Sequence, residues 1–114
     1  MSFQTRELRE SNADALMANE WLVGWEFNPL PIELYPSTGL AMLSEDGESV
    51  YVGFVWTSNS GMAQIGFVTR NPFNKTKLPK DTRKQFLHEL KEYAHSLGYP
   101  YVITWTENKN LVGD

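Results

Sequence analysis

The dipeptide Asp46-Gly47 separates two runs of residues that favour β-structure, residues 39–44 and 49–57. Asp-Gly between two apolar runs is a strong hairpin signal, because both residues tolerate the positive φ angles of a tight turn. The second run leads through a Ser- and Gly-rich turn at 58–61 into a third β-rich run over 62–69. The sequence therefore predicts three antiparallel strands in a meander.

A helix and a further strand follow the meander. Residues 99–106 form a run of aromatic and β-branched residues typical of a strand buried on both faces. Gly98, just before this run, stands where the C-cap of a helix over the preceding residues is expected. A strand, a helix and a strand in succession predict a right-handed crossover that makes the two strands parallel. The helix is predicted from one apolar stripe at helical spacing, Phe86, Leu87, Leu90, Tyr93, Ala94 and Leu97.

The first part of the chain is less regular. Residues 3–10 contain few apolar positions and fit an edge strand. Ser11-Asn12-Ala13-Asp14 has the form of a helix N-cap, which predicts a helix over about 12–23 that Gly24 ends. Residues 25–38 contain three prolines and are expected to form a loop with a short turn of helix.

This order, β-α-β-β-β-α-β, predicts an α+β fold with a mixed sheet, and 114 residues are enough for one domain, residues 1–114. The absence of Cys excludes disulfides and thiolate metal sites, and two His residues disfavour a zinc site. No apolar run is long enough for a membrane helix, and the N-terminus lacks the pattern of a signal peptide. We therefore expect a cytoplasmic protein without a membrane partner.

Charge is distributed unevenly along the chain. The net charge is −4, which disfavours general binding to nucleic acid. Residues 70–91 nevertheless carry a net charge of +5, because seven Lys and Arg residues are balanced only by Asp81 and Glu89. Such a segment fits a compact polyanion such as a phosphorylated cofactor. The alternative is a solvated helix start whose charges serve solubility.

The chain resembles the GNAT-type N-acetyltransferases, which have this order of elements. Residues 6–15 look like the family's first strand and helix entry, and Ile65-Gly66-Phe67-Val68 looks like its fourth strand. Residues 86–99 resemble the central helix with its Leu-Gly-Tyr exit, and residues 102–108 resemble the fifth strand. The resemblance implies acetyl-CoA as cofactor, with the main chain of Phe67, Val68 and Thr69 pairing with the amides of pantetheine.

Two departures from the family pattern limit what the resemblance implies. Residues 72–79 lack the glycines that bring the family's backbone amides close to the pyrophosphate, so Lys75, Thr76 and Lys77 are the predicted phosphate contacts. The sequence ends at Asp114, where the family has a last helix and further strands. We interpret the chain as a short, C-terminally truncated member that lacks these elements.

Other candidate site residues each have a second interpretation. Asn108 matches the family's Asn beside pantetheine, or it caps the following turn. Glu33 and Glu107 are candidates for a general base, or they are solvated surface acids. The aromatic residues around Gly24, which are Trp21, Trp25 and Phe27, line the acceptor side by analogy with the family, or they form a small core under the proline-rich loop.

The leading functional hypothesis is an acetyl-CoA-dependent N-acetyltransferase that acts on an amine by direct attack. The alternative is a catalytically inactive GNAT-like module that binds a protein partner, as expected of a compact phage or mobile-element factor. A homodimer is then expected to cover the edge that truncation uncovers. A third hypothesis is an unrelated α+β interaction domain.

Overall fold

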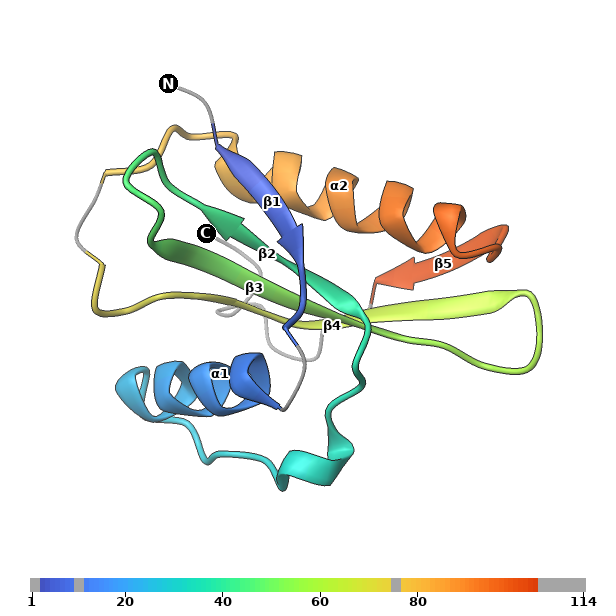
Figure 1. Ribbon diagram of the computed structural model, residues 1–114, viewed down its shortest axis with the longest axis horizontal. Helices are drawn as coiled ribbons and strands as arrows, with labels where there is room; N and C mark the ends of the chain where they lie inside the picture. The colour runs from blue at the N-terminus through green and yellow to red at the C-terminus, as the bar shows by residue number, and fades with distance from the viewer. Residues whose placement is uncertain (1–2, 10–11, 75–76, 105–114) are drawn as a thin grey trace.

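A computed structural model describes residues 3–9, 12–74 and 77–104. Its sheet has the strand order β1-β2-β3-β4-β5, in which neighbours are antiparallel except for the parallel pair β4 and β5 (Figure 1). The predicted meander, the parallel crossover and the α+β class are therefore confirmed. The elements are β1 (Gln4–Glu7), α1 (Ala13–Gly24), the 3-10 turn η1 (Ile32–Leu34), β2 (Gly39–Leu43), β3 (Ser49–Trp56), β4 (Met62–Arg70), α2 (Thr82–Ser96) and β5 (Tyr101–Thr104).

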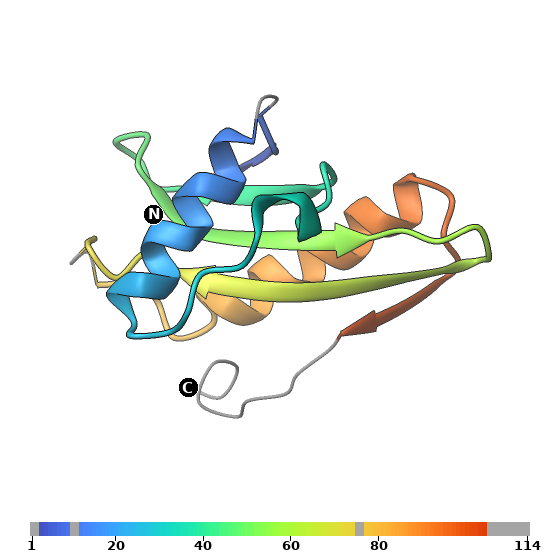
Figure 2. The same cartoon turned by 90° about the horizontal axis from the view of Figure 1, so that it is seen from below.

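The two helices cover opposite faces of the sheet (Figure 2). The predicted apolar stripe of α2 buries Phe86, Leu90 and Ala94 against one face. On the other face, Ala18 and Trp21 of α1 pack with inward-facing residues of β2 and β3. Successive residues of a strand point to opposite faces, so the central strands are apolar on both sides. In the described ranges, neither helix is long and apolar enough to cross a bilayer.

The predicted hairpin between β2 and β3 is present. The backbone N–H of Ser44 donates to the carbonyl of Glu48 at 2.8 Å, and Gly47 has φ of 85°. Glycine carries no steric penalty at this angle, which explains why it stands there. At the other side of β2, β1 forms the edge strand that residues 3–10 predict.

The ends of α1 differ from the prediction. The helix extends through Gly24, and the residue with left-handed backbone is Glu26, with φ of 67°. The N–H of Phe27 donates to the carbonyl of Leu22 at 2.8 Å, which closes the helix as a Schellman motif. At the start, the N-cap residue is Asn12, which makes no side-chain cap bond, and Ser11 lies outside the described residues.

Asp14 does not cap the helix but joins α1 to β1 and to the segment that follows β1. Its buried carboxylate accepts hydrogen bonds from the guanidinium groups of Arg6 at 3.0 Å and Arg9 at 2.8 Å. The backbone N–H of Arg9 also donates to this carboxylate. Burial raises the pKa of Asp14, but the bonds from Arg6 and Arg9 outweigh burial and lower the pKa to about 2.

The C-terminal end of α2 follows the prediction, whereas the strand after it does not. Gly98, with φ of 102°, ends the helix, and its N–H donates to the carbonyl of His95 at 2.9 Å. The expectation of a strand buried on both faces is wrong for β5, because Tyr101 is 70% exposed and Ile103 43% exposed. The strand lies at the edge of the sheet, where α2 covers one face and α1 does not reach the other (Figure 2).

Candidate functional site

Strand β4 contains a bulge at Phe67 and Val68. The register with β3 shifts between Val52 and Phe54, so that these two residues stand opposite the single residue Gly53. Phe67 has φ of 50°, a region that residues with a Cβ rarely occupy. A bulge bends its strand and redirects the groups around it. The direction of β4 therefore changes at Phe67.

Beyond the bulge, one edge of β4 is open within the described ranges. Strand β5 pairs with β4 only over Met62–Ile65. From Gly66 to Arg70, no strand lies beside this edge in the part of the chain that the structure describes (Figure 1). An unpaired strand edge presents backbone N–H and C=O groups that an extended ligand can bind.

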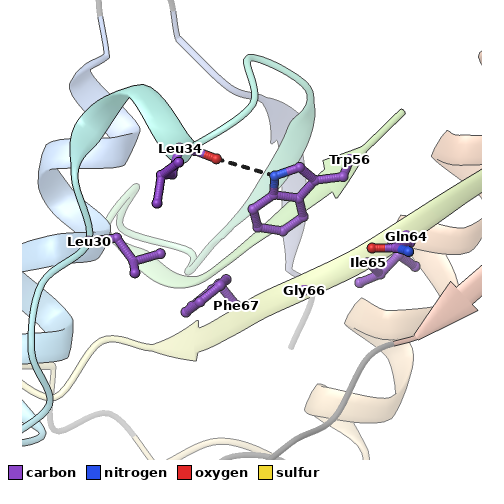
Figure 3. A pocket seen from close by; sticks show the side chains of 7 residues that line it. All are labelled: Leu30, Leu34, Trp56, Gln64, Ile65, Gly66 and Phe67. Carbon is purple, nitrogen blue, oxygen red and sulfur yellow. Dashed lines mark hydrogen bonds between the residues drawn. The ribbon is translucent and has the colours of Figure 1, made fainter. Parts of the chain in front are cut away.

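A pocket of about 340 Å³ lies on the α1 face of β4, next to the bulge. Two leucines enter it from the segment between α1 and β2, and an indole enters from the end of β3 (Figure 3). The floor is β4 itself. The lining residues are Leu30, Leu34, Trp56, Gln64, Ile65, Gly66 and Phe67.

The indole of Trp56 is fixed in the pocket wall. Its Nε1–H donates to the carbonyl of Leu34 at 3.2 Å (Figure 3). Its ring centroid lies 5.8 Å from that of Phe67. A Cβ at Gly66 would stand 2.9 Å from the Trp56 ring, so the indole can lie this close to β4 only because residue 66 is glycine.

Asn19 of α1 holds the loop side of the pocket. Its Nδ2 donates to the carbonyl of Leu30 at 2.8 Å, and its Oδ1 accepts from the N–H of Leu30 at 3.0 Å. The same oxygen accepts from the hydroxyl of Tyr35 at 2.8 Å. The Tyr35 ring lies 6.2 Å from the Phe67 ring, centroid to centroid. One amide therefore positions both the loop and an aromatic support of the bulge.

The pocket is apolar, and the described residues that line it include no titratable side chain. None of its seven lining residues carries an acidic or basic group, and Gln64 supplies the one polar side chain. Tyr35, behind the wall, does not act as a base near neutral pH, because burial raises its pKa to about 12. Chemistry in this pocket thus depends on shape, apolar contact and hydrogen bonding.

The structure brings the predicted β4 residues to the bulge and the open edge. Phe67 lines the pocket, and Val68 is buried in the core on the α2 face. Thr69 is buried, and its hydroxyl donates to the carbonyl of Phe67 at 3.1 Å. Their contact with pantetheine stays a prediction.

The predicted phosphate site lies near the start of α2. Lys77, Lys80 and Lys84 are exposed there, and Lys75 and Thr76 lie outside the described residues. In the first turn of α2, Nε of Arg83 is buried and has no hydrogen-bond partner within the described ranges. A donor without a partner is costly, and an anion is a group that satisfies one.

The structure does not bring Glu33, one of the two predicted general bases, into the pocket. Glu33 is exposed in η1 and, although it precedes Leu34, it does not line the pocket. Glu107 and Asn108 lie outside the described residues. The roles proposed for these three residues stay predictions.

The aromatic residues around Gly24 do not form one cluster. Trp21 is buried in the core under α1, whereas Trp25 is 46% and Phe27 36% exposed. The indole Nε1–H of Trp25 donates to the carbonyl of Arg70 at 2.8 Å, so it fastens the end of β4. The interpretation as a small core holds only for Trp21. None of the three residues lines the pocket described above.

The residues that shape the pocket, above all Asn19, Trp56 and Leu34, were not among the predicted site residues. One signal pointed to them. Gly66 interrupts an apolar strand, and a glycine inside a strand often marks the close approach of another group; here that group is the Trp56 ring. The role of Asn19 depends on the loop conformation, which no local pattern in the sequence specifies.

Solved structures with a similar fold are acetyltransferases. N-acetylglutamate synthase from Neisseria gonorrhoeae, complexed with coenzyme A and N-acetyl-glutamate, matches 96% of this chain with a TM-score of 0.70 and 10% identity. A GNAT-family acetyltransferase from Staphylococcus aureus matches 97% with a TM-score of 0.68 and 10% identity. Phosphinothricin acetyltransferase from Sinorhizobium meliloti, a GNAT-superfamily protein in complex with acetyl-CoA, matches 91% with a TM-score of 0.62 and 12% identity.

The chain has the GNAT fold. The matches cover 26% of the Neisseria protein, 77% of the Staphylococcus protein and 65% of the Sinorhizobium protein, so this chain spans less than two thirds of two of them. No family model and no curated protein matches the sequence. The likeness to GNAT proteins is thus one of fold, and activity has to be argued from the site.

Proposed function

We propose that this chain is an acetyl-CoA-dependent N-acetyltransferase that acts on an amine by direct attack. The observation that carries the proposal is the position of the bulge at Phe67. It lies just beyond Ile65, the last residue of β4 that pairs with β5, and beside the apolar pocket. An open strand edge and a pocket that meet at one point can hold a donor and an acceptor together.

The open edge of β4 fits an extended donor molecule. The backbone of Phe67, Val68 and Thr69 would hold the pantetheine arm, with Asn108 beside it. Lys75, Thr76 and Lys77 would hold the phosphates, and the Nε of Arg83, which has no partner among the described residues, supports an anion near this end. The Neisseria and Sinorhizobium proteins, which share the fold, bind coenzyme A and acetyl-CoA respectively.

Acetyl-CoA supplies an activated acetyl thioester when bound. The contribution of the chain is to orient the acceptor and to exclude water, for which the apolar pocket is suited. Phe67 and Val68 stand together opposite Gly53 in the register of β4 with β3. We assign their backbone N–H groups the role of donors to the acyl oxygen, since preorganised donors stabilise the charge that develops there.

A second candidate function is a catalytically inactive module that binds a protein partner. It is favoured by Leu16 and Val23 of α1, which are 55% and 56% exposed. A second copy of this chain is one candidate partner, and light scattering of the purified protein distinguishes a monomer from a homodimer. Under either function we expect the protein in the cytoplasm.

Detection of an acetylated product tests the enzymatic proposal. The full chain is incubated with acetyl-CoA and a panel of amines, release of thiol is followed with a thiol reagent, and N-acetylated products are identified by mass spectrometry. We expect thiol release that depends on an amine. Binding of acetyl-CoA without transfer to any amine would favour the inactive module.

A further inference from the structure

We propose that the acceptor is a small aromatic amine that enters the pocket uncharged, of the aniline type. The inference rests on the proposed function and extends it to the class of acceptor. It depends on three properties of the pocket: its lack of charge, its aromatic walls and its volume.

The described lining of the pocket carries no charge that would favour an ammonium group. None of the seven lining residues carries a carboxylate, so an alkylammonium that entered would lose water without gaining an ionic partner. An alkylamine has a pKa near that of lysine, about 10.4, so at neutral pH it has to lose a proton before it can attack. The described lining residues offer no base for this proton, and Tyr35, with its raised pKa of about 12, offers none either. An aniline is already neutral at pH 7.

The aromatic walls favour a flat ring. The rings of Trp56 and Phe67 are tilted by 52° with centroids 5.8 Å apart, and Gly66 leaves the strand between them without a side chain. A third ring can pack edge-to-face or offset against these two, which adds to the energy of apolar burial. Gln64 lies away from the two leucines (Figure 3) and presents a carboxamide that can accept a hydrogen bond from an amine N–H.

The volume limits the size of the acceptor. About 340 Å³ lies at the lower end of the range for small-molecule sites, roughly 300–1,000 Å³. One ring with small substituents fits, and a folded peptide does not.

In the transfer, the amine nitrogen forms a bond to the acetyl carbon and the carbon–sulfur bond breaks with its electron pair on sulfur. The nitrogen then loses its proton to water, and the thiolate takes one up, so that amide and thiol are the products.

Three matched amines test the acceptor class by binding alone. The probes are 4-methylaniline, benzylamine, which is aromatic but charged, and 4-methylcyclohexylamine, which is charged and not aromatic. Binding at pH 7 is followed by the indole Nε1–H resonance of Trp56, which is assigned with Trp56→Phe. We expect 4-methylaniline to bind at least about tenfold more tightly than either charged amine. Equal or tighter binding of a charged amine would overturn the proposal, as would the absence of any shift with 4-methylaniline.

Leu34→Glu provides a test by reversed preference. Leu34 is 55% exposed, so the variant should fold, and its carboxylate would stand at the pocket wall. We expect it to strengthen binding of benzylamine relative to 4-methylaniline. Leu16→Glu is the matched control, because Leu16 is also 55% exposed but lies on α1 outside the pocket lining. An unchanged preference in Leu34→Glu would count against the uncharged acceptor.

Failure of this inference can be told apart from failure of the proposed function. Titration with acetyl-CoA reports the donor site without any acceptor, and the amine titrations report the pocket without any donor. If the protein also turns over, kcat/KM for 4-methylaniline should be flat between about pH 6 and 8, whereas an alkylamine should gain about tenfold per pH unit. A tenfold rise with 4-methylaniline would contradict an acceptor that arrives neutral.

Discussion

The ring of Phe67 lies 5.8 Å from the ring of Trp56, centroid to centroid, and this contact joins the bulge of β4 to the end of β3. Phe67 thus has two roles in the structure. Its backbone makes the bulge, and its side chain makes one wall of the pocket. Substitutions in the pocket wall should therefore also alter the backbone at the strand edge that we assign to the donor.

Substitution of Phe67 tests the left-handed backbone. An L-residue in this region costs roughly 1–2 kcal/mol, and glycine avoids this cost. We expect Phe67→Gly to be more stable than Phe67→Ala by about 1 kcal/mol, measured by urea unfolding. Ile65 serves as the control, because it pairs regularly with β3, and there alanine should be the more stable of the two. If the alanine variant were the more stable of the two at both positions, the left-handed backbone at Phe67 would be contradicted.

Asn19→Ala tests how the pocket is held. The change leaves the N–H and C=O of Leu30 without their partner, which should cost about 1–3 kcal/mol of stability. Hydrogen exchange at the Leu30 amide should become faster, and binding of 4-methylaniline weaker. Asn59→Ala, in the exposed turn between β3 and β4, is the matched control. Equal exchange rates in the two variants would mean that Asn19 does not hold the loop.

Asp14 predicts how stability depends on pH. Its folded pKa, about 2, lies below the ordinary value of 3.8, so it stabilises the fold fully above the unfolded pKa. This contribution is lost as the pH falls from about 4 to about 2. Asp14→Asn should cost about 2 kcal/mol at pH 7 and remove this part of the acid sensitivity. Glu20→Gln, on the exposed side of α1, is the control and should leave the dependence of the unfolding free energy on pH unchanged. If Asp14→Asn kept the acid sensitivity of the wild type, the role assigned to Asp14 would be refuted.

Lys75→Ala with Lys77→Ala tests the predicted phosphate site. Loss of two cations should weaken acetyl-CoA binding by about tenfold or more, and added salt should weaken the variant less than the wild type. Lys91→Ala, an exposed cation farther along α2, is the control and should bind as the wild type does. Calorimetric affinities at low and moderate salt give the answer. An unchanged affinity in the double variant would show that the phosphates of acetyl-CoA bind to other residues.

Local patterns predicted most of the fold. Asp46-Gly47 specified a turn, and the stripe from Phe86 to Leu97 with Gly98 specified a helix and its end, because these signals depend only on neighbouring residues. The expectation for β5 was wrong because Tyr101 and Ile103 are apolar yet lie at a sheet edge, and burial there depends on what covers the edge.

The site was predicted only in part. Phe67, Val68 and Thr69 were predicted from the resemblance of one strand to the fourth strand of the GNAT proteins, and that strand carries the bulge. The walls of the pocket come from residues far apart in the sequence, such as Leu30 and Trp56, so no local spacing pattern predicts them. The aromatic residues near Gly24 attracted attention because they cluster in sequence, but helix geometry turns Trp21 inward and leaves Trp25 exposed.

The central claim is that the open edge of β4 binds acetyl-CoA. Isothermal titration of the purified full chain with acetyl-CoA, and separately with desulfo-CoA, tests it most directly. We predict saturable binding of both with a Kd on the order of micromolar, which corresponds to about −8 kcal/mol. No heat and no thermal shift at millimolar acetyl-CoA would contradict the account, and would leave a GNAT fold that serves to bind another partner.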